Sequence, residues 1–388
     1  MCRNLNLSPC TRILVNGRIC FLLQFVTESL WSPLGTYLAN VKKQGIILFR
    51  GTSALHHVAT CLHPKVFEVK WVEFSPGENY LVSTVLNKKT LRAVISIFDV
   101  KTGKVVKKIV GGPHDFANKG VGASWPIFKW SGGRDDKYFA LISKNVISIY
   151  EINTFTVILT VGNVTDFSWS PTDAILALFV SESVDAGGAI PALVKLVQIP
   201  NKEQLIEKKL SSVSNCKMYW QSNGEYLAMK VDSSTNNFVE LFQIKDRGID
   251  NKILVLPYNE DKVTAFAWEP KGHRFAIIQS NEDISFYSMR DAASTGCVSL
   301  LTILRSKGTN YLFWSPSGGL IILARLNGSN GNLEFFNVDE LRTVAISKHQ
   351  RLSSGTQPRY VATSTPGTCH EKPSFNVWSF DGHLLYQL

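Results

Sequence analysis

The chain has 388 residues, of which 45% are hydrophobic and 11% aromatic, and its formal net charge is +10. This length is enough for one large repeat fold or two ordinary domains with a sizeable core. The charge informs about partners and not about fold, and no apolar run is long enough to span a membrane as a helix.

Seven cysteines are scattered along the chain, and no two of them have C-x-x-C spacing. An odd, scattered set is more typical of reduced thiols in a cytosolic protein than of a disulfide framework. We therefore expect a cytoplasmic location.

The N-terminal segment, residues 1–28, matches no repeat. Its apolar stretch Cys20–Val26 follows Arg12 and Arg18, as the apolar part of a signal peptide would. The stretch is short, contains Gln24 and lacks a small-residue cleavage site. A strand that enters an incomplete first blade is the favoured interpretation.

From residue 29 to residue 388, a two-part unit recurs at intervals of roughly 40–50 residues, the length of a four-stranded propeller blade. Its first part is an aromatic residue, a tight turn and a short apolar strand. The copies are Trp31–Ala39, Phe74–Val82, Trp130–Ala140, Trp169–Ala177, Trp220–Ala228, Trp268–Ala276 and Trp314–Ile322.

The second part of the unit is an alternating strand, with the period near two of a half-buried strand. The eight copies are Gly45–Phe49, Val94–Val100, Val146–Ile152, Leu193–Ile199, Phe238–Ile244, Asp283–Met289, Asn332–Val338 and Ser374–Phe380. These repeats predict an all-β fold, a β-propeller with WD-like repeats and eight recognisable blades.

The turns and aromatic residues of the unit have physical roles. In Ser32–Gly35, Pro33 presets φ and Gly35 closes the turn; in Ser75–Glu78, the glycine at the third position predicts a type II turn. One Trp per blade favours packing between blades over a ligand-binding box.

Two segments interrupt the repeat. Gly111–Phe128 and Ser181–Ala192 are predicted to be surface loops, because strand units resume on both sides of each. Asn201–Leu210, the best helix candidate, is short and polar, so we expect an outer strand or a loop.

Basic residues follow several of the alternating strands, where a blade has its outermost strand. We therefore expect three basic groups on the outer rim, each in a different blade. They are Lys101, Lys104, Lys107 and Lys108 in the first, Lys208 and Lys209 in the second, and Arg305 with Lys307 in the third. They are candidates for contacts to RNA phosphates. The alternative is that they are solvated charges that protect an edge strand from aggregation.

Sequence patterns of catalysis and cofactor binding are absent. The loop Gly111–His114 lacks the Gly-Lys-Ser/Thr and the helix of a phosphate site, and neither G-x-S-x-G nor H-E-x-x-H occurs. His56, His57, Cys61 and His63 match no zinc spacing. Acidic residues such as Asp136 lie in turns, where they usually bind local amides. We expect no catalytic, cofactor or metal site.

Several longer strings resemble the b subunit of eukaryotic translation initiation factor 3, of plant type. They are Trp31–Ala39, Phe74–Val82, Trp125–Trp130, Asn145–Glu151, Asp166–Asp173, Cys216–Gly224, Ala265–Ala276 and Leu333–Leu341. The resemblance covers Val26 to Leu388. It implies a nine-bladed propeller, of which eight blades are recognisable here.

The resemblance also implies a non-catalytic scaffold of the translation initiation factor 3 complex, which binds the small ribosomal subunit, its rRNA and other subunits of the factor during initiation. It implies no membrane and no small-molecule substrate. Three features depart from the family: its N-terminal RNA-recognition-type domain and C-terminal helical tail are lacking, so the chain is expected to be shortened at both ends, and Ser353–Tyr360 replaces a regular turn.

Two alternatives remain open. The chain could be a generic protein-interaction propeller outside translation, or it could resemble the related initiation factor 2A. On fold alone a propeller peptidase or glycosidase is a third class, which the lack of a nucleophile motif disfavours.

Overall fold

The computed structural model describes residues 14–387 apart from gaps at 16–17, 20–27, 43–44, 52–54, 65–66, 88–89, 91, 113–114, 116–126, 186–187, 234–236, 245–251, 255, 257–261, 291–296, 326–330, 350–352, 357–359, 366–373 and 380. The chain divides into two compact units: one is Val15–Ser211, and the other, called here the Ser212–Leu388 unit, is Ser212–Leu388 together with Met1–Leu14. Each is described by itself.

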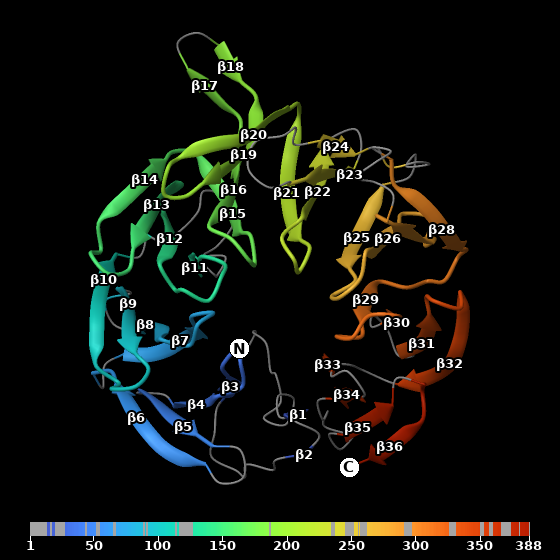
Figure 1. The fold of residues 1–388 in the computed structure, drawn as a ribbon, viewed down its shortest axis with the longest axis horizontal. Coiled ribbons are helices and arrows are strands. Elements are labelled where there is room, and N and C mark those ends of the chain that lie inside the picture. The colour runs from blue at the N-terminus through green and yellow to red at the C-terminus, as the bar shows by residue number, and fades with distance from the viewer. Residues whose placement is uncertain are drawn as a thin grey trace. The chain divides into compact units, whose positions relative to one another are not determined.

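The Val15–Ser211 unit contains four four-stranded antiparallel sheets, three with strands in sequence order and one with strand order β15-β16-β19-β20 (Figure 1). The strands are β3 (Glu28–Trp31), β4 (Tyr37–Lys42), β5 (Gly45–Arg50), β6 (His56–Leu62), β7 (Phe67–Phe74), β8 (Tyr80–Asn87), β9 (Ala93–Asp99), β10 (Val105–Gly111), β11 (Phe128–Trp130), β12 (Tyr138–Ser143), β13 (Val146–Glu151), β14 (Val157–Val161), β15 (Val164–Trp169), β16 (Ile175–Val180), β19 (Ala192–Gln198) and β20 (Glu203–Leu210).

The Ser212–Leu388 unit repeats this architecture in four further sheets. Its strands are β21 (Val213–Trp220), β22 (Tyr226–Ser233), β23 (Asn237–Gln243), β24 (Lys252–Leu254), β25 (Val263–Trp268), β26 (Arg274–Gln279), β27 (Ile284–Ser288), β28 (Ser299–Leu304), β29 (Tyr311–Trp314), β30 (Leu320–Arg325), β31 (Gly331–Asn337), β32 (Arg342–His349), β33 (Ser353–Thr356), β34 (Tyr360–Thr365), β35 (Ser374–Ser379) and β36 (Leu384–Gln387).

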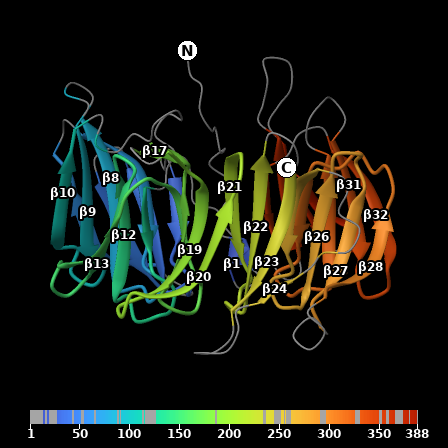
Figure 2. The same ribbon diagram turned by 90° about the horizontal axis from the view of Figure 1, so that it is seen from above.

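Among the described residues, seven of the eight four-stranded sheets begin with a strand that ends in the aromatic residue of the repeat, and the exception is the sheet that begins with β33. Each of the eight finishes with an outermost strand such as β10 or β28 (Figures 1 and 2). A succession of such four-stranded meanders is the β-propeller fold, so the predicted fold class is confirmed. The described residues contain strands and turns but no helix, hence none that is long and apolar enough to span a membrane.

Two sequence-based expectations concern the N-terminus and a late turn. Of residues 1–28, the structure describes a pair of two-residue strands, β1 (Leu14–Val15) and β2 (Arg18–Ile19), and the start of β3. The incomplete first blade otherwise falls outside the described residues, and the number of blades remains a prediction. In Ser353–Tyr360, β33 and β34 pair as a hairpin, and the turn between them is not described.

For Asn201–Leu210 the expectation was an outer strand or a loop, and the structure has the outer strand β20 (Glu203–Leu210). The insertion Ser181–Ala192, predicted to be a loop, contains a small hairpin of β17 (Ser183–Asp185) and β18 (Gly188–Ile190). Most of Gly111–Phe128 lies outside the described residues.

The turn between the first two strands of a sheet is a closed loop with a recurring hydrogen-bond pattern. Ser32 N and Ser75 N donate to the carbonyls of Tyr37 and Tyr80, and each serine Oγ accepts the amide of the same tyrosine at 2.8 and 2.9 Å. The Glu78 amide donates to Ser75 O at 3.0 Å. The serine of the repeat is therefore a turn-closing residue.

The predicted type II turn at Ser75–Glu78 is wrong. Positive φ occurs at Glu78, where it is 61°, and not at Gly77. Gly77 is required for space, because a Cβ there would lie 2.2 Å from the Arg134 carbonyl oxygen of the next sheet's turn. The glycine therefore allows two neighbouring turns to approach each other.

The repeat tryptophans pack between sheets, as predicted. The Nε1 groups of Trp169, Trp268 and Trp314 donate to the carbonyls of Lys129, Tyr219 and Ala267 at 3.2, 2.8 and 3.2 Å. Each acceptor directly precedes the tryptophan of the previous sheet. Because these three indoles are hydrogen-bonded and pack against core residues, they are not available to stack on a ligand.

Neighbouring turns are also joined by buried carboxylates, here called the turn clasps. The Asp136 carboxylate accepts hydrogen bonds from Ser75 Oγ, the Gly77 amide, and the amide and Nδ2 of Asn79, at 2.7–3.2 Å. Glu78 Oε1 accepts the Leu34 amide at 2.7 Å. Asp136 was expected to bind local amides, but its partners lie 57–61 residues away.

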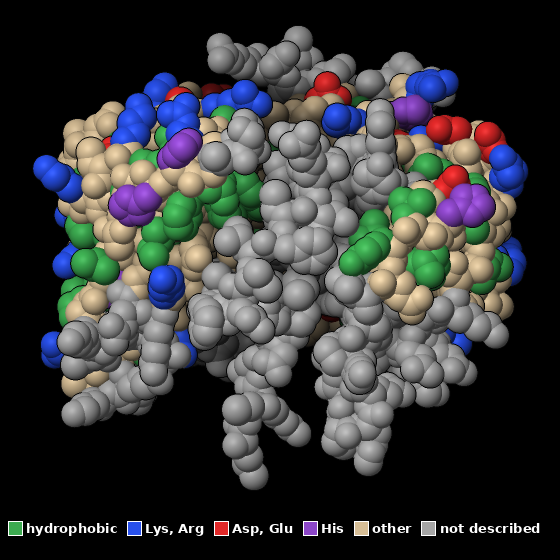
Figure 3. Space-filling view, turned by 90° about the horizontal axis from the view of Figure 1, so that it is seen from below, with side chains coloured by type: hydrophobic (Ala, Val, Ile, Leu, Met, Phe, Trp, Pro, Cys, Tyr) green, Lys and Arg blue, Asp and Glu red, His purple; other side chains and the backbone are tan. Residues whose placement is uncertain are grey.

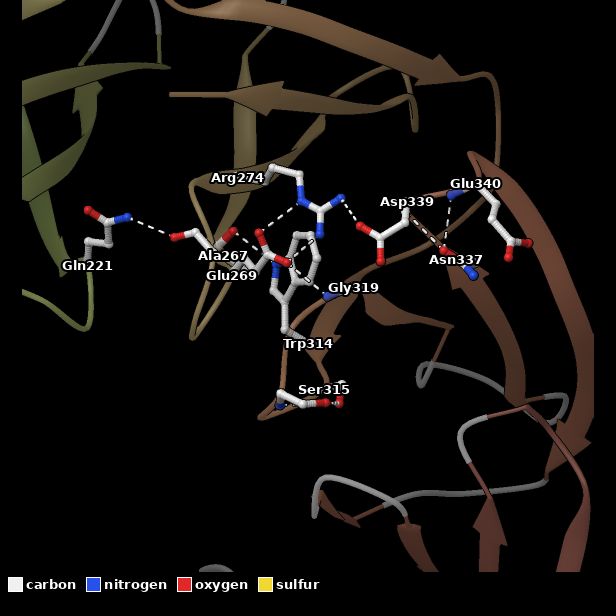
Figure 4. Close-up of polar contacts among 12 residues, drawn as sticks. Gln221, Ala267, Glu269, Arg274, Trp314, Ser315, Gly319, Asn337, Asp339 and Glu340 are labelled. Carbon is white, nitrogen blue, oxygen red and sulfur yellow. Dashed lines mark hydrogen bonds and ion pairs between the residues drawn. The ribbon is translucent and has the colours of Figure 1, made fainter. Parts of the chain in front are cut away.

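A third clasp lies in the Ser212–Leu388 unit (Figure 4). Arg274 donates to both Glu269 oxygens, from Nε at 2.9 Å and from Nη2 at 2.5 Å, and Glu269 Oε1 also accepts the Gly319 amide of the next turn at 2.8 Å. Arg274 Nη1 reaches Asp339 at 2.6 Å. The pair therefore fastens the β25–β28 sheet to the β29–β32 sheet.

Candidate nucleic-acid interface on the outermost strands

The first basic group lies where the sequence predicted, at the outermost strand of its sheet. Lys101 and Lys104 are in the turn between β9 and β10, and Lys107 and Lys108 are on β10. The turn is closed by Asp99, whose Oδ1 accepts the Thr102 amide at 2.8 Å and the Thr102 hydroxyl at 2.7 Å. This fixes the backbone that carries Lys101 and Lys104, both of which are exposed.

The four lysines do not point the same way. Lys107 is half-buried, and its Nζ lies 5.0 Å from the centre of the Phe155 ring in the next sheet. Lys108 is its neighbour along the strand and is exposed on the other face. Lys107 therefore contributes to packing through a cation–π contact. Among the described residues no ion pair is formed by Lys101, Lys104 or Lys108, and these three can approach phosphate.

The second basic group is at the end of β20, again an outermost strand. Lys209 is exposed and lies opposite Leu193 in the register, whereas Lys208 is half-buried opposite Val194. On the face drawn in Figure 3, described basic side chains stand at separate places among neutral ones and form no continuous patch. The candidate basic residues thus lie in small groups on or beside separate outermost strands.

The third basic group, beyond β28 in the Ser212–Leu388 unit, is neutralised by acidic residues. Arg305 Nη1 lies 2.6 Å from the buried Asp283 carboxylate, and Lys307 Nζ lies 2.8 and 3.0 Å from the two oxygens of Glu334. The hydrogen bond from the Ser306 amide and the Arg305 guanidinium lower the pKa of Asp283. Arg305 and Lys307 thus hold their own loop and are poor candidates for RNA contact.

The histidines and cysteine that raised the question of a metal lie on and beside β6. His56 and His57 are exposed, Cys61 is buried, and His63 Nε2 lies 2.9 Å from the Ser83 hydroxyl. Burial raises the pKa of Cys61 to about 12, and burial with the Lys108 charge lowers the pKa of His63 to about 4. In the described part of the chain, no three His, Cys, Asp or Glu residues gather as a metal site.

Sequence reasoning missed a row of charges on three consecutive innermost strands. Lys129 on β11 lies 3.6 Å from Asp166 on β15, and its Nζ also donates to the Phe167 carbonyl. On the other side is Glu73 on β7. Burial raises the pKa of Glu73 to about 7, and the opposing effect of the Lys129 charge, which lowers this pKa, is smaller. Alternation on a single strand gives no sign of this row, because its members come from three sheets.

Glu73 gives a prediction about pH. Because its pKa is raised in the folded state, the folded chain holds a proton that the unfolded chain releases above its usual pKa of 4.5. The stabilising effect of that proton is therefore lost as pH rises from about 4.5 through 7. We expect Glu73→Gln to stabilise the chain by about 2 kcal/mol at pH 8 and by almost nothing at pH 4.5.

Urea unfolding at the two pH values measures this difference. Glu203→Gln on the exposed start of β20 is the matched control and is expected to have no effect at either pH. An equal effect of Glu73→Gln at pH 4.5 and pH 8 would show that ionisation of Glu73 is not the cause.

The comparisons with known proteins give one family match and two solved structures of similar fold. Residues 208–388 match the family described as "Eukaryotic translation initiation factor eIF2A". A solved structure described as a eukaryotic initiation factor has a TM-score of 0.73 and 16% identity, and covers 93% of this chain and 87% of that chain. Dipeptidyl peptidase 4 of Porphyromonas gingivalis has a TM-score of 0.57 and 12% identity, and covers 90% of this chain and 57% of its own. These two structures support the fold alone.

Sequence relatives are more specific. The B subunit of eukaryotic translation initiation factor 3 is 48% identical in Arabidopsis thaliana, 47% in Nicotiana tabacum and 34% in Bombyx mori, over 92%, 94% and 92% of this chain. The chain spans about half the length of these relatives, 53%, 54% and 52%. Over nearly its whole length, the chain is thus a homologue of the B subunit of eukaryotic translation initiation factor 3, and it resembles the two plant proteins more than the insect one.

Proposed function

We propose that this chain is the propeller part of a non-catalytic scaffold subunit of the translation initiation factor 3 complex, which acts in the cytoplasm. It binds the small ribosomal subunit and other subunits of the factor during initiation of protein synthesis. The observation that carries the proposal is 48% identity over 92% of the chain to a protein named as the B subunit of that factor. On this proposal, residues 29–388 form one propeller, and residues 1–28 are a separate segment.

The contact to ribosomal RNA is assigned to the exposed members of two basic groups, Lys101, Lys104 and Lys108 beside β10 and Lys209 on β20. Ammonium groups that meet phosphates release counterions, so the affinity depends steeply on salt. Lys107, Arg305 and Lys307 are left out, because each is engaged by a residue of its own chain.

We expect the triple variant Lys101→Glu, Lys104→Glu and Lys108→Glu to bind small ribosomal subunits about tenfold to a hundredfold more weakly at moderate salt. The slope of log affinity against log salt concentration should become less steep by about two to three. Co-sedimentation with purified small subunits over a range of salt concentrations measures both quantities.

A control triple with the same change of charge is Lys42→Glu, Arg134→Glu and Lys271→Glu, all exposed and away from the outermost strands. It should bind with nearly the original salt dependence. If the two triples behave alike, net charge alone governs binding, and the outermost-strand lysines only protect the edge. If the unsubstituted chain does not sediment with small subunits, the proposed function itself is wrong.

The family match over residues 208–388 favours a second candidate, a role like that of initiation factor 2A. The two candidates differ in partners, since a subunit of factor 3 must associate with other subunits. Affinity purification of the chain from initiation complexes separates them: other factor 3 subunits are expected, and their absence together with ribosome binding would favour the 2A-like role. Purification without ribosomes or initiation factors would favour an interaction propeller outside translation.

A further inference from the structure

The hairpin β17–β18 is an addition to the regular sheet architecture. It is inserted between β16 and β19, the two middle strands of its sheet, and it projects away from the rest of that sheet (Figure 1). The equivalent connection in the preceding sheet, between β12 and β13, has two residues, Lys144 and Asn145. The insertion is therefore not needed to join the strands.

The base of the hairpin is held in place. The Ser181 amide donates to the Asn163 carbonyl at 3.0 Å, and the Val164 amide, next along the chain, donates to the Asn145 carbonyl at 2.9 Å. The connection between β14 and β15 thus holds Ser181, the first residue of the insertion, and is itself held by the connection between β12 and β13. The hairpin is presented at a defined position.

Its apolar side chains face solvent. Val184 is 82% exposed and Ile190 is 39% exposed, and Ala189, which pairs with Val184, and Pro191 are also exposed. In the described part of the chain no third strand pairs with β17 or β18. A two-stranded hairpin is marginal in water, and a third strand stabilises it by pairing its free edge and covering its apolar side chains.

The charge of the hairpin limits what that third strand can be. Glu182 and Asp185 lie in the insertion, and no Lys or Arg occurs between Ser181 and Val194, although the chain as a whole has a net charge of +10. An acidic, apolar element repels phosphate and attracts a basic, apolar partner. RNA is therefore disfavoured here, and a basic polypeptide is favoured.

We propose that β17–β18 is a docking site for an extended segment of a basic protein of the small ribosomal subunit, which adds to the hairpin as a third strand. Its apolar residues cover Val184 and Ile190, and its Lys or Arg residues lie beside Glu182. The choice of partner rests on the proposed function, because proteins that pack on ribosomal RNA carry basic residues to neutralise phosphate. Lys209, opposite Leu193 directly after the insertion, would contact RNA next to that segment.

The test places a photo-crosslinking amino acid at Val184 of the full chain and irradiates it with purified small ribosomal subunits. We expect a cross-link to a Lys- and Arg-rich segment of one ribosomal protein, identified by mass spectrometry. Val157, which is 51% exposed on the outermost strand β14, is the matched control position and should not give this cross-link. A cross-link from Val184 to RNA, or none while the chain remains bound, overturns the inference and leaves the proposed function standing.

A second measurement uses substitution. The pair Glu182→Lys and Val184→Lys should weaken binding to small subunits about tenfold without making the salt dependence shallower, because repulsion replaces attraction at the hairpin. Val157→Lys should bind as the unsubstituted chain does. If the double variant binds as tightly as the unsubstituted chain, the inference is overturned. If the unsubstituted chain itself does not bind small subunits, the proposed function is overturned as well.

Discussion

Asp136→Ala is expected to destabilise the chain by about 3 kcal/mol. The carboxylate is 1% exposed and accepts hydrogen bonds from Ser75, Gly77 and Asn79 in the turn of the previous sheet. Hydrogen bonds to a charged group contribute about 1.5–3 kcal/mol each but are not additive when they share one acceptor. Alanine also leaves the Gly77 and Asn79 amides without their acceptor.

The variant Asp136→Gly distinguishes the contribution of the carboxylate from that of the backbone conformation. The residue two positions before the first residue of the second strand is glycine in several repeats, at Gly35, Gly224 and Gly318, all with positive φ. Asp136 has φ of 50° at that position, which is strained for a residue with a Cβ. We therefore expect glycine to be about 1 kcal/mol less destabilising than alanine and still clearly worse than aspartate.

Urea unfolding measures these changes, and hydrogen exchange locates them, since the amides of Gly77 and Asn79 should lose protection. The control is Asp135→Ala, whose half-exposed side chain pairs with the exposed Lys137 and should hardly matter. Equal stability of the Asp135 and Asp136 variants would mean that the clasp contributes nothing.

The repeats and turns could be predicted from sequence because their determinants are local. The serine and tyrosine that close a turn, such as Ser32 and Tyr37, are five residues apart, and the apolar pattern of each strand marks its buried face. The clasps could not be predicted, because Asp136 and its partners belong to different repeats. A signal did exist: an acidic residue at a position where other repeats have glycine.

The candidate interface was predictable only in part for the same reason. The sequence shows where Lys and Arg lie, and repeat order correctly placed them at outermost strands. It does not show their counter-charges: Asp283 lies 22 residues from Arg305, and Glu334 lies 27 residues from Lys307. The ring of Phe155, which engages Lys107, comes from another sheet. Charge alone therefore predicted more RNA-contacting residues than the structure leaves exposed and without a counter-charge.

Arg274→Ala is expected to cost about 3–4 kcal/mol at neutral pH, because it leaves the Glu269 carboxylate, whose side chain is 2% exposed, without its cation. Burial alone would raise the pKa of Glu269, but the hydrogen bonds from Arg274 and the Gly319 amide and the charge of Arg274 outweigh it and lower the pKa. The pair thus stabilises the fold above the usual glutamate pKa, and this contribution is lost as pH falls through the lowered value.

Two comparisons make the Arg274 prediction specific. The double variant Glu269→Ser with Arg274→Tyr restores the residues that close the turns at Ser32–Tyr37 and Ser75–Tyr80, and it removes the buried charge with its partner. It should therefore be less destabilised than Arg274→Ala alone, since a buried pair is often replaceable as a unit. The cost of Arg274→Ala should also shrink at pH 4, where Glu269 without its cation can bind a proton. Urea unfolding of both variants at pH 7 and pH 4 measures these differences in the free energy of unfolding. Suppose that Arg274→Ala is no less stable than the double variant and is destabilised equally at both pH values. The unpaired carboxylate would then not be what destabilises the fold.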